Sequence, residues 1–139
     1  MRNSIELPRG FLPAMFAGLA LMLSGASAHS ACLKDNADGQ TAEGKLTVQR
    51  AKDAAGRSER PYILQLAADA CLDTQDPEDA VKATRTIHVF PADEKTEPAF
   101  KQLVGKTVTV SGNPFVAHTA HHHAPIVMRV DRIELAAKR

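Results

Sequence analysis

The chain has few aromatic residues and almost no excess of charge of either sign. Of its 139 residues, five are Phe, one is Tyr and none is Trp, and 17 Lys and Arg are balanced by 16 Asp and Glu. Nucleic-acid binding draws on uncompensated cations and on aromatic rings that stack on bases. We therefore expect no nucleic-acid partner.

The sequence also lacks an unbroken apolar run that could anchor it permanently in a membrane. Its longest apolar stretch, residues 11–23, is short and is interrupted by Pro13 and Gly18. A membrane-spanning helix needs about 20 predominantly apolar residues.

The same stretch is typical of an export signal. Arg2 and Arg9 precede it, and the small residues Ala26-Ser27-Ala28 follow it, as in a cleaved signal peptide. We predict a signal peptide over residues 1–28 and a single domain over residues 29–139. The protein is then periplasmic or secreted, without membrane contact after cleavage, and its oligomeric state is left open.

Cysteine occurs only twice, as Cys32 and Cys71. In an oxidising compartment such a pair usually forms a disulfide, and we expect it to tie the amino terminus to the end of an early strand. A thiol or metal pair is the alternative, but neither residue has a neighbour typical of redox motifs.

Short apolar runs with a period of two indicate five half-buried strands. They cover residues 46–48, 62–66, 86–90, 107–111 and 126–130. Val127 and Ile133 break the last alternation, which indicates either a strand buried on both faces or a bulge. Two longer polar segments, residues 51–60 and 73–82, separate the first three runs and are expected to be loops.

One helix is expected between strands three and four. Thr96 could cap it, Phe100, Leu103 and Val104 fall on one face, and Gly105 ends it. We therefore predict a mainly β fold, a small five-stranded OB-like barrel with this one helix. An open antiparallel sheet covered by a helix is the alternative, and the barrel is favoured because closure removes exposed edges.

Four of the six histidines lie in one stretch between strands four and five: His118, His121, His122 and His123. Neutral imidazole is a good ligand for zinc and copper. In a helix the first three would share a face, and in a strand His121 and His123 would point the same way. We predict a zinc or copper site here, with all four residues as candidate ligands.

The remaining ligands of such a site are open. Candidates are His88, Asp131, the free amino end at His29, a second chain or water. Two further interpretations of the stretch also remain open. It could be a structural turn whose rings pack on Phe115 and bond to the main chain, or a patch that senses pH or contacts a partner.

These observations predict an exported small binding module that holds a transition metal in a histidine-rich loop. The alternative is a protein-interaction module, such as an envelope inhibitor or immunity protein, that uses the loop as a contact surface. We expect no enzyme, because the cysteines are expected to be oxidised and neither a serine nucleophile motif nor a clear general base is present.

Several motifs together resemble a family of secreted bacterial proteins catalogued as domain of unknown function 4431. They are Ala31-Cys32-Leu33-Lys34, the run 62–66 leading to Cys71, the segment 103–112 and the segment 115–125. The resemblance implies a secreted, small, disulfide-bearing domain, and it brings no established activity.

Overall fold

The computed structural model describes residue 10 and residues 31–138. The predicted signal peptide and His29 lie outside the described residues, apart from Gly10. The elements are β1 (Leu33–Lys34), β2 (Gln40–Val48), β3 (Ala51–Lys52), β4 (Ser58–Glu59), β5 (Tyr62–Asp73), β6 (Val81–Pro91), α1 (Glu97–Leu103), β7 (Thr107–Val116) and β8 (Ile126–Leu135). In this part of the chain, no helix combines the length and the apolar character that crossing a bilayer requires.

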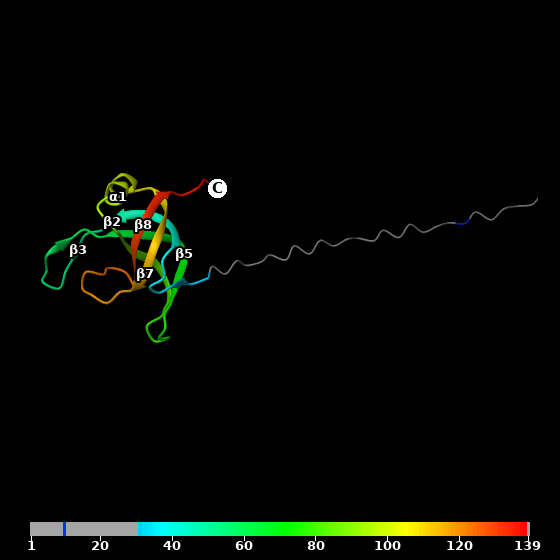
Figure 1. The fold of residues 1–139 in the computed structure, drawn as a ribbon, viewed down its shortest axis with the longest axis horizontal. Helices are drawn as coiled ribbons and strands as arrows, with labels where there is room; N and C mark the ends of the chain where they lie inside the picture. The colour runs from blue at the N-terminus through cyan, green and yellow to red at the C-terminus, as the bar shows by residue number, and fades with distance from the viewer. Residues whose placement is uncertain (1–9, 11–30, 139) are drawn as a thin grey trace, which may run out of the picture.

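The five long strands close into a barrel. They follow one another in the order β5-β2-β7-β8-β6, and β6 pairs again with β5 (Figure 1). The β6–β8 pair is parallel, and the other four pairs of the barrel are antiparallel. The prediction of a mainly β fold with a closed five-stranded barrel and one helix is confirmed.

The inward positions of the alternating strands form the core. Phe100 of α1 is fully buried in the same core, and its ring centroid lies 5.0 Å from that of Tyr62 at the start of β5. Full burial of each large apolar side chain contributes about 1.5–3 kcal/mol. The fully buried strand residues of this core are Leu46, Leu64, Leu72, Ile87, Val89, Val108, Val110, Ile126, Met128 and Val130.

The ends of α1 differ in detail from the expected pattern. Thr96 makes no side-chain cap, and both its main-chain N–H and its hydroxyl donate to Asp93 Oδ1, each over 2.9 Å. The helix ends at Leu103, so Val104 leaves the helical face and is 38% exposed. The expectation that Val104 shares the buried face of the helix was wrong, because the helix would have to include residue 104 for its side chain to lie on that face.

β8 both carries a bulge and is buried on two faces, the two explanations that the broken alternation of its sequence left open. Ser111 pairs with Arg132 but the next residue, Gly112, pairs with Val130, so Asp131 is the extra residue of a bulge. Val127 lies between His88 on β6 and Phe115 on β7 and is fully buried. Because its neighbours Ile126 and Met128 fill the core, Val127 must be covered from outside the barrel.

The predicted disulfide is confirmed: Cys32 bonds to Cys71 across a sequence separation of 39. It holds β1 against the far end of β5, where Leu33 pairs in parallel with Leu72. The bridge therefore ties the start of the described domain to an early strand.

Replacing both cysteines, Cys32→Ser/Cys71→Ser, is expected to lower the free energy of unfolding by about 3–4 kcal/mol, because a closed loop of this length restricts the unfolded chain. Urea denaturation of the variant and of the oxidised protein measures the difference. Reduced protein should match the double variant, and a loss below about 1 kcal/mol in both would contradict the expectation.

Candidate metal site at the barrel rim

Two connections meet at one end of the barrel. The hairpin segment, residues 49–61, joins β2 to β5, and the His loop, residues 117–125, joins β7 to β8. In Figure 1 both project from the same side of the barrel, the hairpin segment beside the label β3 and the His loop in orange. The hairpin segment was expected to be an open polar loop. It instead contains the antiparallel pair β3–β4, with Ala51 opposite Glu59.

Asp53 fixes the turn of the hairpin segment. Its Oδ1 accepts the main-chain N–H groups of Ala55 and Arg57 at 2.9 and 2.8 Å, and its Oδ2 accepts Arg57 Nε at 2.7 Å. Gly56 supplies the positive φ of 77° that the turn needs. These bonds, led by that from the Arg57 main chain, hold the pKa of Asp53 below its usual range. The short strand β4 is thereby held in place beside β3.

Bonds to its own main chain shape the His loop. His122 Nδ1 accepts the main-chain N–H groups of His118 and Thr119 at 3.0 and 3.3 Å. His118 Nδ1 donates to the carbonyl of Val116 at 3.0 Å. Two ring nitrogens of the histidine-rich stretch are therefore engaged within the loop, as the structural-turn interpretation expects.

The rings of His118 and His122 also pack on Phe115, with centroid distances of 5.6 and 5.4 Å. The His122 ring lies 6.3 Å from that of His88 on the other side. Since Val127 lies between Phe115 and His88 in the sheet, His122 covers it. Burial lowers the pKa of His122, which favours the neutral ring that its Nδ1 contacts require.

His88 supports the base of the loop from β6. The main-chain N–H of His123 donates to His88 Nδ1 over 3.2 Å, and the two ring centroids are 5.6 Å apart. Burial, followed by the neighbouring His123 and His122, lowers the pKa of His88 to about 4. His88 is therefore neutral near pH 7, with Nδ1 occupied as an acceptor.

His121 and His123 point instead at the hairpin segment and converge on Glu59. His121 Nδ1 contacts Glu59 Oε1, and His123 Nε2 lies 2.6 Å from Glu59 Oε2. Hydrogen bonds from His123 and His121 hold the pKa of Glu59 below its usual range. The side chains of Glu59 and His123 are 24% and 15% exposed, whereas His121 is 60% exposed.

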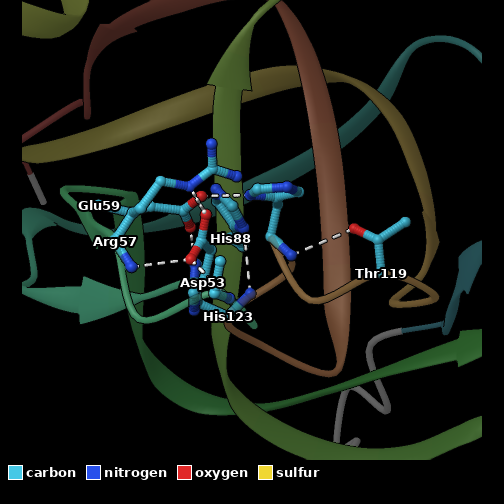
Figure 2. A network of polar contacts seen from close by, with 8 residues as sticks. Asp53, Arg57, Glu59, His88, Thr119 and His123 are labelled. Atoms are coloured by element: carbon cyan, nitrogen blue, oxygen red, sulfur yellow. Dashed lines mark hydrogen bonds and ion pairs between the residues drawn. The ribbon is translucent and has the colours of Figure 1, made fainter.

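Asp53 completes a group of donor atoms. One ligand atom from each of Asp53, Glu59 and His121 lies within 4.8 Å of the others. Figure 2 shows Asp53, Glu59 and His123 gathered together, with Arg57 reaching in to Asp53. Imidazole nitrogens combined with carboxylate oxygens suit zinc. The same arrangement can also act as an ion-paired contact between the two segments.

The structure therefore separates the residues of the predicted site. His121 and His123 converge on Glu59, while His118 and His122 turn towards Phe115 and the main chain. Of the candidate additional ligands, His88 lies next to His123. Asp131 is the exposed residue of the β8 bulge, one residue after Val130, which pairs with Pro91. Sequence reasoning missed Glu59 and Asp53, because no local spacing distinguishes them in a polar segment.

No curated protein matches the chain. Residues 86–134 match the family described as Domain of unknown function (DUF4431). The matched segment contains His88 and the whole His loop, and the hairpin segment with Glu59 precedes it. The family resemblance seen in the sequence motifs is confirmed over residues 86–134, which are similar to this family.

Proposed function

We propose that this protein is an exported small binding module of the OB type that holds zinc or copper at the rim of its barrel. Export is supported by the signal-like pattern of residues 1–28 and by the Cys32–Cys71 disulfide, since disulfides persist in oxidising compartments. The mature domain begins after residue 28 and works in the periplasm or outside the cell.

The OB assignment rests on topology. Three barrel strands, β2, β5 and β6, precede α1, and β7 and β8 follow it. The third and fifth of these strands pair in parallel, which closes the barrel. In OB folds the connections between strands one and two and between strands four and five border the ligand-binding face. The hairpin segment and the His loop occupy those two connections.

The single observation that carries the metal proposal is the convergence of two imidazoles on one carboxylate. His121 Nδ1 and His123 Nε2 each reach a separate oxygen of Glu59. Two His and one Glu are a known zinc ligand set, which leaves a further coordination position open. Because Asp53 is already bonded to Arg57 and to two main-chain N–H groups, it serves the site by holding β4 in position.

This ligand set is narrower than the histidine-rich stretch suggested. His122 uses Nδ1 to accept two N–H groups, and binding a metal there would break the turn. His118 donates through Nδ1 to a carbonyl, and its ring packs on Phe115 away from Glu59. We therefore assign the metal to Glu59 and His121, which share one group of donor atoms with Asp53, and to His123 as a further ligand that contacts the other oxygen of Glu59.

Calorimetric titration of the purified, untagged exported protein with zinc, copper and nickel tests the proposal. We expect binding at micromolar concentration or tighter. Since even residues that only support a ligand change metal affinity 10- to 100-fold, His121→Ala/His123→Ala should weaken it at least ~100-fold, and Glu59→Gln at least ~10-fold.

His118→Ala is the matched control, because it removes an imidazole of the same loop that lies away from Glu59. Its affinity should stay within about threefold of the parent protein, a free-energy change below about 0.7 kcal/mol. Absence of heat with every metal would refute the proposal. It would favour the protein-interaction module, in which the two histidines and Glu59 only join the His loop to the hairpin segment.

A further inference from the structure

The two faces of the hairpin segment differ in charge. β3 pairs with β4 in a register that sets Ala51 opposite Glu59 and Lys52 opposite Ser58. Opposite residues of an antiparallel pair share a face, and successive residues of a strand alternate between faces. Because Glu59 contacts the His loop, the other face looks away from that loop. This second face, the cationic face, carries Arg50, Lys52, Ser58 and Arg60.

The charge of the cationic face is not neutralised within the molecule. Arg50, Lys52 and Arg60 are all exposed. Across the described part of the chain, no ion pair involves any of the three side chains. Arg57 of the same segment pairs with Asp53 on the opposite face. Three cations at one projecting segment are therefore available to a partner of opposite charge.

A groove of about 690 Å³ carries the opposite charge. It lies between the end of β7 and two loops, and neither Lys nor Arg lines it. In Figure 1 one of these loops, residues 74–80, extends below the barrel, whereas the hairpin segment extends to its left. Phe115 and Val116 add apolar surface to the lining. Its three carboxylates come from Asp35, Asp76 and Asp79.

The carboxylates of this acidic groove have no cationic partner among the described residues. Asp35 Oδ2 accepts the side-chain amide of Asn36 over 2.8 Å, and Asp76 Oδ1 accepts the main-chain N–H of Glu78 over 3.0 Å. Both donors are neutral, so they leave the negative charge in place. A chain with nearly balanced charge thus separates its two signs onto different surfaces.

We propose that the cationic face of one copy of this protein binds the acidic groove of a second copy. Three unpaired cations on one surface match three unpaired carboxylates on the other. Arginine presents paired N–H donors that fit a carboxylate, and its apolar stem can lie against Phe115 and Val116. Because the contact joins two different surfaces, it is head-to-tail, and each copy in a pair keeps one surface free for a further copy.

This contact is weak and depends on salt. Exposed ion pairs contribute little individually, and a surface of a few side chains is small beside a stable interface. We therefore expect a Kd of about 0.1–1 mM at low salt. The 17 Lys and Arg are balanced by 16 Asp and Glu, so net charge does not keep copies apart.

Sedimentation equilibrium of the purified exported protein tests the proposal. A chelator is present throughout, so the result does not depend on the proposed metal site. At about 20 mM NaCl the average mass should rise with protein concentration up to about 1 mM. In about 500 mM NaCl the association should weaken at least ~10-fold, because exposed charges are screened.

Two variants identify the surfaces. The ribbon variant, Arg50→Gln/Lys52→Gln/Arg60→Gln, and the groove variant, Asp35→Asn/Asp76→Asn/Asp79→Asn, should each associate at least ~10-fold more weakly than the parent. An equimolar mixture of the two should regain association, since the first keeps its groove and the second keeps its cationic face. The mixture should stop at a 1:1 pair, because neither copy can bind a third.

A matched control removes three exposed cations outside both surfaces: Lys106→Gln/Arg132→Gln/Lys138→Gln. It has the same net charge as the ribbon variant and should associate as the parent does, within about threefold. A parent protein that stays monomeric at low salt overturns the proposal. So does equal weakening in the control and the ribbon variant, or a mixture of the ribbon and groove variants that associates no better than either alone.

Discussion

Gly112→Ala is expected to lower the free energy of unfolding by about 3 kcal/mol or more, the upper part of the range for overpacked sites. A Cβ atom at position 112 would lie 2.0 Å from the carbonyl oxygen of Arg129 and 2.9 Å from Cα of Val130. Both obstacles are backbone atoms of β8, so a change of side-chain rotamer cannot relieve the contact. The collision falls where β7 meets the bulge of β8, and relieving it would separate two strands of the closed barrel.

Urea denaturation measures this loss, and Gly105→Ala separates it from the ordinary cost of replacing glycine. Gly105 has a φ of 84° and nothing within 4 Å of an added Cβ, so alanine there carries only the cost of the left-handed conformation, about 1 kcal/mol. If both variants lost the same free energy of unfolding, the close approach of the β8 backbone would not explain why position 112 requires glycine. Because β7 and β8 carry the His loop, Gly112→Ala should also weaken metal binding.

The barrel could be predicted from local sequence because strands such as β6 and β7 alternate between buried and more exposed residues. Val108 and Val110 of β7 are fully buried, and so are Ile87 and Val89 of β6. In each strand the buried residues are two positions apart, as in a half-buried strand. The same reasoning underestimated β2, which begins at Gln40, six residues before the first apolar position used to predict it. Gly44 explains part of this: an added Cβ would lie 2.4 Å from the carbonyl oxygen of Gln65, so β2 and β5 approach closely where the strand has no side chain.

The candidate site was only half visible in the sequence. A cluster of imidazoles is a local pattern, but Glu59 lies 62 residues before His121 and is brought to it by barrel closure. Of the two spacing rules, the one for a strand paired the histidines that meet, because His121 and His123 both contact Glu59. Residues 119–122 form a turn in which His122 N–H donates to the Thr119 carbonyl over 3.1 Å. The His loop is therefore neither a helix nor a strand.

His88 should titrate near pH 4 in the folded protein, far below the 6.5 typical of histidine. Burial is the main cause, and the nearby His123 and His122 add to it, while Glu59 acts in the opposite direction. The unfolded chain therefore takes up a proton on His88 between pH 6.5 and 4 that the folded chain does not. The stabilisation is complete above pH 6.5 and is lost as the pH falls towards 4. Because His88 is partly exposed, we expect the loss to be about 1–2 kcal/mol.

NMR titration of the ring protons of His88 measures the pKa directly, and urea denaturation at several values between pH 7.5 and 4 measures the stability. Both use a chelator, so that no metal contributes. In His88→Gln the amide oxygen can still accept the His123 N–H, but it does not titrate, and the fall in stability over this interval should be smaller by the same 1–2 kcal/mol. His118→Gln alters an exposed ring outside the contacts of His88 and should leave the fall unchanged.

Acid should also loosen the His loop before the barrel unfolds. Protonated His88 carries hydrogen on both ring nitrogens and cannot accept the His123 N–H, the bond that holds the loop to β6. Amide exchange at His123 should therefore become faster, relative to the barrel strands, as the pH approaches 4. A His88 ring that titrated near pH 6.5, with exchange at His123 unaffected by acid, would show that neither burial nor this bond constrains the loop.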